Sequence, residues 1–153
     1  MKWIPNDIAQ YEQEKAYIDT ALVPLLALDF HNDIKHTAAM AEFTSLMTGE
    51  VEKQFRGRML LTPPFTYLKN NDFNDNLTSL KEWLSSMKDS GIKHVVFITS
   101  DPLWKKAEAE IDELLLWMPL VPFENMDTSY KRQIISEQIK QILPLLLDKW
   151  KNE

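Results

Sequence analysis

Four short apolar runs that alternate with segments of helical periodicity limit the fold of this chain more than any other feature of its sequence. The runs cover residues 22–29, 58–62, 94–99 and 118–123. Apolar and polar residues do not alternate within them, which is typical of strands buried on both faces of a parallel sheet. Between them, apolar residues recur every three or four positions in residues 40–55, 77–87, 103–114 and 135–150, and this spacing predicts helices.

Strands that alternate with helices favour an α/β fold with right-handed crossovers. A weaker helical pattern over residues 8–17 precedes the first strand. We therefore predict a three-layer α/β/α sandwich, Rossmann-like or flavodoxin-like, with a four-stranded, mainly parallel sheet. The length of 153 residues predicts a single α/β domain, residues 1–153.

Prolines modify three of these elements. Pro119 and Pro122 lie in the fourth run, and since proline cannot donate to a sheet ladder, we expect this strand at an edge. Pro24 in the first run calls for a bulge or a strand end. Pro144 interrupts the last helical pattern, and we expect it to kink that helix near Lys140.

Charge and composition exclude several classes of protein. Lys and Arg number 17 against 23 Asp and Glu, a formal charge of −6 without a basic block, so we predict no nucleic-acid partner. There is no cysteine for a disulfide or a thiolate metal site. Residues 1–7 lack the apolar core of a signal peptide, and the apolar runs fall short of the ~20 residues that span a bilayer. We expect a cytoplasmic protein without membrane insertion.

The placement of glycine argues against the common nucleotide-binding loops. Such loops need glycine in the turn from strand to helix, yet Gly49, Gly57 and Gly91 all lie elsewhere. No G-x-S-x-G elbow of a serine hydrolase occurs. A phosphatase of the haloacid dehalogenase type would carry a second aspartate where His31 follows Asp29. The sequence therefore indicates no particular cofactor, and it leaves open whether the protein is an enzyme.

Open parallel sheets bind ligands at the carboxyl ends of their strands, above all where the strand order reverses. With the order 2-1-3-4, this point lies between the first and third strands. The residues that we expect there form a candidate crevice: Asp29, His31, Asp33, Thr99, Ser100, Asp101 and Trp104. Clustered carboxylates can hold Mg²⁺, and one can act as a general base beside His31. The spacing of the histidines fits no zinc site, so we predict no metal ligand set.

Helix capping is the structural alternative for most of these carboxylates. Asp33 and Asp101 each precede a predicted helix, where a side-chain oxygen satisfies a free backbone N–H, and Asp127 or Thr128 can do the same for the last helix. Asp29 ends an apolar strand and has no evident capping role. It is therefore the best single candidate for a functional carboxylate.

Several short motifs along the whole chain carry a family resemblance. They include Met1-Lys2-Trp3, Gln54-Phe55-Arg56-Gly57-Arg58, and Thr99-Ser100-Asp101 with Trp104. On these residues the chain resembles the YpiF-type family of small uncharacterised proteins from Bacillus-like bacteria. The resemblance implies no activity, cofactor or catalytic residue.

Two functions remain open from the sequence. The first is a cytoplasmic interaction or accessory protein without a catalytic motif, which binds a protein partner or a second copy of itself as a homodimer. The second is a small-molecule or metal-binding enzyme that uses the candidate crevice, with Asp29 as base or ligand. A fold alone does not choose between them.

Overall fold

A parallel sheet in the order β2-β1-β4-β5, with β3 also paired to β1, organises the computed structural model, which describes residues 1–152. The strands are β1 (Thr20–Leu28), β2 (Met59–Leu61), β3 (Phe65–Leu68), β4 (His94–Thr99) and β5 (Leu114–Trp117). The helices are α1 (Pro5–Gln13), α2 (Ile34–Gln54), α3 (Phe73–Asp89), the 3₁₀ helix η1 (Pro102–Glu110) and α4 (Thr128–Lys151). Every strand pairing is parallel, as predicted.

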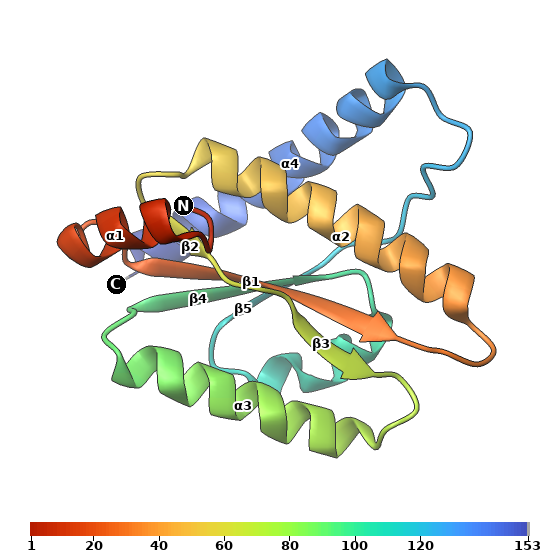
Figure 1. Cartoon of the computed structure of the whole chain (residues 1–153), viewed down its shortest axis with the longest axis horizontal. Helices are drawn as coiled ribbons and strands as arrows, with labels where there is room; N and C mark the ends of the chain where they lie inside the picture. Colours follow the sequence, from red (N-terminus) through yellow and green to blue (C-terminus); the bar gives the residue numbers. More distant parts are fainter. Residues whose placement is uncertain (153) are drawn as a thin grey trace.

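Two helical layers cover the two faces of the sheet. Figure 1 shows α2 and α4 on one side and α3 on the other. Successive β1 residues point to opposite faces, so Leu22 joins the core beneath α2 and α4, whereas Val23 and Leu25 join the core beneath α3 and η1. This arrangement confirms the three-layer α/β/α sandwich, with five strands in place of the predicted four.

The fifth strand, β3, was not predicted and follows the predicted strand at residues 58–62, which is β2. β2 pairs with the first part of β1 and β3 with its last part, and Pro63 and Pro64 lie between them. Leu22 O accepts from Thr62 N at 3.0 Å, so the even-numbered β1 residues direct their backbone groups toward β2 and β3. Pro24 is the next even-numbered residue of β1. It faces the gap between β2 and β3 at Pro63 and Pro64, where the sheet needs no backbone N–H from β1. A central strand therefore accommodates Pro24 without ending there.

The predicted fourth strand at residues 118–123 is wrong. The strand at this edge is β5, and residues 118–123 have no regular structure. The run Leu114–Trp117 is free of proline, whereas Pro119 and Pro122 deprive the following residues of ladder donors. The edge position expected for this strand is nevertheless confirmed.

The predicted helix over residues 103–114 is also shorter than expected. It is the 3₁₀ helix η1, which ends at Glu110, and Leu114 already belongs to β5. Its side chains Trp104 and Ala107 are buried, which accounts for the first half of the apolar stripe. Of the rest of the stripe, Ile111 is buried directly after η1 and Leu114 begins β5.

The last helix continues through its proline. α4 runs for 24 residues with Pro144 inside it. Its end is held to the sheet by Trp150, whose indole N–H donates to Thr20 Oγ1 at 2.8 Å. No helix within residues 1–152 is long and apolar enough to cross a membrane.

Candidate functional site

The carboxyl ends of β1 and β4 lie at one edge of the sheet because the two strands are parallel neighbours. Asp29 follows β1, and Ser100 and Asp101 follow β4. Asp29, Thr99, Ser100 and Asp101 are all buried. The candidate crevice therefore brings buried polar residues from two strands to the same edge.

Asp101 is held in a buried chain of hydrogen bonds. The Trp104 indole N–H donates to Tyr67 Oη at 2.7 Å, and Tyr67 Oη donates to Asp101 Oδ2 at 2.5 Å. The other carboxylate oxygen accepts from Leu103 N at 3.0 Å, which is the predicted N-cap of η1. Burial, together with the adjacent Asp101 carboxylate, raises the pKa of the Tyr67 phenol, so it remains a hydrogen donor.

Trp104 is fully buried and does not form an open wall of the crevice. Its ring contacts Phe65, Tyr67 and Phe73, with centroid separations of 6.3, 5.3 and 5.0 Å. The indole N–H supplies the polar end of this aromatic cluster. Trp104 thus positions Tyr67 and, through it, Asp101.

Thr99 and Ser100 differ in how their hydroxyls are used. Thr99 Oγ1 donates to Leu25 O at 3.1 Å and accepts from Asp101 N at 3.0 Å, so it joins β4 to β1. Ser100 Oγ is buried and has no hydrogen-bond partner within residues 1–152. Ser100 O accepts from the Trp117 indole N–H at 3.2 Å. The Ser100 hydroxyl is therefore an unused polar group at the carboxyl edge.

The residues after β1 form a second polar group at this edge. Asp29 Oδ1 accepts from His31 N at 2.9 Å and closes a turn, while the His31 side chain is exposed. Asp33 stands at the N-cap position of α2 but makes no cap bond. Its Oδ2 accepts from Lys69 Nζ at 2.6 Å, and this hydrogen bond lowers the pKa of Asp33 and raises that of Lys69.

Tyr67 and Lys69 are polar members of this edge that the sequence analysis did not identify. Both depend on β3, which was not predicted, because Tyr67 lies within that strand and Lys69 directly after it. Burial alternates along residues 65–68, but the exposed Leu68 is apolar, so the sequence offers only a short run of β-prone residues as a signal. The three histidines do not gather here, since His94 begins β4 at the opposite end. Within residues 1–152 no three acidic or histidine side chains are placed to hold a metal ion.

A second candidate surface is an apolar groove of about 640 Å³ between α1 and α3, which we call the α1–α3 groove. From α1 and the turn after it come Ile8, Tyr11, Glu12 and Lys15. From α3 and its C-cap come Glu82, Trp83, Ser86, Met87 and Ser90. It is also lined by Leu60, Thr62, Pro63 and Ile92, and by Trp3, which has 56% of its surface exposed. Its volume lies in the range of about 300–1,000 Å³ typical of binding sites.

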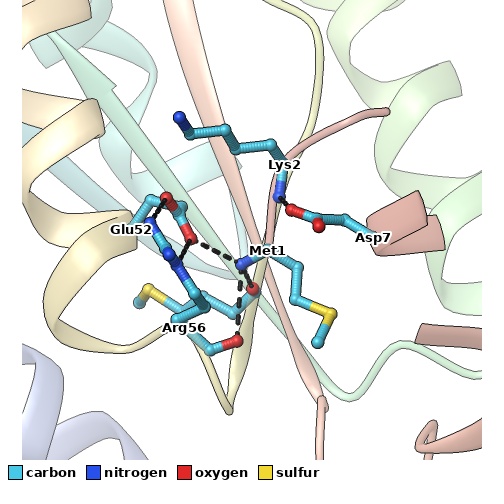
Figure 2. A network of polar contacts seen from close by, with 6 residues as sticks. Met1, Lys2, Asp7, Glu52 and Arg56 are labelled. Carbon is cyan, nitrogen blue, oxygen red and sulfur yellow. Dashed lines mark hydrogen bonds and ion pairs between the residues drawn. The ribbon is translucent and has the colours of Figure 1, made fainter. Parts of the chain in front are cut away.

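A network around the Met1 amino group anchors the residues that precede Trp3 (Figure 2). The ammonium donates to Glu52 Oε2 at 2.8 Å and to Met59 O at 2.7 Å, and Met1 and Glu52 are buried. Lys2 N donates to Asp7 Oδ2 in α1 at 2.8 Å. Trp3, directly after these anchored residues, is thereby held at the mouth of the groove.

Comparison with known proteins confirms the family resemblance of the sequence motifs. The family described as "Protein of unknown function (DUF2487)" matches residues 9–150. The chain is similar to the "Uncharacterized protein YpiF" of Bacillus subtilis (strain 168), with 38% identity over 151 residues that cover 98% of each chain. No solved structure matches.

Proposed function

We propose a function for this chain, which belongs to the DUF2487 family of proteins of unknown function, from the contrast between its two candidate surfaces. It is a cytoplasmic interaction or accessory protein that works by binding a protein partner. The observation that carries this proposal is the α1–α3 groove, an open apolar surface with an exposed tryptophan at its mouth. Clefts of this volume, lined mainly by apolar and aromatic side chains, are typical of binding sites.

The carboxyl edge supports the same proposal by the way its acids are used. Asp101 holds Tyr67 and caps η1, Asp33 pairs with Lys69, and Asp29 closes a turn. Each of these contacts is of a kind that stabilises a fold. They account for the three carboxylates at this edge without a reaction.

In-cell photo-crosslinking tests this proposal. A benzophenone amino acid replaces Trp3 in the full chain, which carries its tag at the C-terminus so that the Met1 amine keeps its contacts. We expect one protein to be crosslinked repeatedly from position 3, and not from the more exposed Tyr17, which lies outside the groove. Crosslinks that are absent, or that are the same from both positions, would refute partner binding at this groove.

A second candidate function is a small-molecule or metal-binding enzyme at the carboxyl edge. The observation that favours it is the buried, unpartnered Ser100 hydroxyl beside Thr99 and Asp101. In this proposal Asp29 is the base or metal ligand, Thr99 and Asp101 are supporting contacts, and His31 carries protons. A homodimer is compatible with either function.

A thermal-shift screen with Mg²⁺, Mn²⁺, nucleotides and sugar phosphates tests the second candidate. A ligand that binds the native state raises Tm by mass action. For a compound that binds at this edge, Asp29→Asn abolishes the shift, and Asp89→Asn on the exposed face of α3 leaves it unchanged. No shift with any compound, or a shift that survives Asp29→Asn, would reject this site.

A further inference from the structure

The two walls of the α1–α3 groove present side chains at helical spacing. On α1, Ile8 is followed three residues later by Tyr11 and four residues later by Glu12. Trp83 and Met87 are four residues apart on α3. Side chains three and four residues apart form the ridges between which another helix packs. The groove therefore has the surface pattern of two helices that lack a third.

The helix α1 packs only weakly against the rest of the protein, which agrees with a binding partner that covers it. None of its nine residues is buried. Ile8 and Tyr11 are only half-buried, although they pack against the small cluster of Met1, Ile18 and Leu60. A nine-residue helix has little stability of its own and depends on tertiary cover.

An extended peptide cannot use the sheet edge beneath this groove. Leu61 N donates to Met1 O at 2.7 Å, and Met59 O accepts from the Met1 ammonium. The outer backbone groups of β2 are thus already paired with the amino-terminal residue. This contact blocks strand addition at β2, whereas an apolar groove between two helices can take an amphipathic helix.

The charges at the rim select the polar residues of such a helix. Glu12 stands on the α1 wall and Glu82 on the α3 wall, and both are exposed. Lys15, whose ammonium lies 5.8 Å from the Tyr11 ring centroid, is the one cation among the lining residues. An acidic residue on each wall favours basic residues on both flanks of the incoming apolar stripe.

We propose that the α1–α3 groove binds an amphipathic helix of a partner protein, with apolar residues at i, i+3 or i+4, and i+7 between α1 and α3, and with Lys or Arg beside Glu12 and Glu82. This inference rests on the proposed function and specifies its partner. Trp3 and Trp83 contribute the aromatic surface that the apolar stripe contacts.

Selection from a display library of 16-residue peptides, with the full chain as bait, tests this inference. We expect enriched peptides with helical apolar spacing and flanking Lys or Arg. Their affinity, measured by fluorescence anisotropy, falls at least tenfold for Trp3→Asp and for the double variant Glu12→Lys/Glu82→Lys. Tyr17→Asp, an exposed change outside the groove, leaves affinity within twofold. All these positions are exposed, and an unchanged Tm shows that each variant is folded.

The outcomes separate this inference from the proposed function. No enrichment, an acidic or extended consensus, or peptides that bind Trp3→Asp as well as wild type would overturn the helix-binding inference. If crosslinking at position 3 still captures a protein in that case, the interaction function stands with a different partner chemistry. If crosslinking also fails, both are wrong.

Discussion

At the scale of single residues, Tyr67 has a buried hydroxyl that bonds to two other buried side chains. Its hydroxyl accepts from buried Trp104 and donates to buried Asp101. Tyr67→Phe removes both bonds and leaves an indole N–H and a carboxylate oxygen without partners. Because unsatisfied buried groups of this kind cost 1–3 kcal/mol each, we expect a loss of about 3 kcal/mol in the free energy of unfolding, measured by urea denaturation.

The matched control for this change is Tyr17→Phe. The Tyr17 side chain is 76% exposed, so the same loss of a hydroxyl should change the free energy of unfolding by less than about 0.5 kcal/mol. Equal effects of the two substitutions would show that the Tyr67 hydroxyl is not part of a buried network.

Glu52 is a second residue whose charge is built into the fold. Burial alone raises the pKa of this carboxyl, but hydrogen bonds from Arg56 and from the Met1 amine outweigh burial and hold the pKa below its ordinary value. A lowered folded-state pKa means that the stabilisation is complete above the unfolded pKa of about 4.3 and is lost as the pH falls through the folded value. Glu52 therefore contributes to acid unfolding.

We expect Glu52→Gln to lower the free energy of unfolding at pH 7 by about 2–4 kcal/mol, since it leaves the buried ammonium of Met1 without its counter-ion. The difference from wild type should shrink below pH 4, as followed by urea denaturation over a pH series. Glu50→Gln is the control: Glu50 is exposed and pairs with Lys53 at the surface, so its effect should stay below about 0.5 kcal/mol. A difference for Glu52→Gln that does not depend on pH would contradict an ion pair.

The single-residue chemistry of the carboxyl edge was only partly predictable from the sequence. The N-cap role of Asp101 followed from its position before Pro102, and the structure confirms it. The bond between Asp101 and Tyr67 joins residues 34 positions apart, and the pair Lys69 and Asp33 spans 36 positions. Contacts over such distances depend on β3, and no local pattern specifies them.

At the scale of secondary-structure elements, α4 contains a proline that lowers the stability of the helix. Pro144 lies inside the helix, where it has no N–H to donate to Lys140 O, and its side chain is exposed. Pro144→Ala restores a donor without opening a cavity. Allowing for the greater freedom of the unfolded chain, we expect a gain of about 1–2 kcal/mol in the free energy of unfolding and a higher Tm.

Pro5→Ala provides the comparison for this prediction. Pro5 occupies the first position of α1, where the missing N–H would have no partner and the fixed φ suits a helix. This substitution should leave the stability unchanged or lower it slightly. A gain at Pro5 as large as at Pro144 would mean that the position of proline in the helix does not determine its cost.

The elements themselves were predictable where one pattern dominated. Periodicity predicts β1, β2 and β4 as buried runs, and α2, α3 and α4 as helices with long apolar stripes. Topology rules then predict the strand order. β5 was misplaced because residues 114–123 form one apolar stretch, and only the ladder requirement excludes its proline-containing half. β3 was not predicted because Pro63 and Pro64 end the preceding apolar run, and pairing with β1 resumes only after them.

At the scale of the whole molecule, Glu113 connects the two helical layers. Its buried carboxylate forms ion pairs with Lys88 near the end of α3 and with Lys149 near the end of α4, and it accepts from Val95 N in β4 at 3.3 Å. Burial alone raises the pKa of Glu113, but the hydrogen bonds from the two lysines outweigh burial and lower it. One carboxylate therefore holds helices from opposite faces of the sheet at its amino-terminal end.

Glu113→Gln should release both helix ends together. We expect faster amide hydrogen exchange in residues 84–89 and in residues 146–151, and a loss of about 2 kcal/mol in the free energy of unfolding at pH 7. Because the folded pKa of Glu113 is lowered, this loss diminishes as the pH falls below about 4.3. Lys149→Met, which removes only the partner on α4, should speed exchange in residues 146–151 and leave residues 84–89 protected. If Glu113→Gln affects one helix end alone, the two layers are held independently and the carboxylate is not their common anchor.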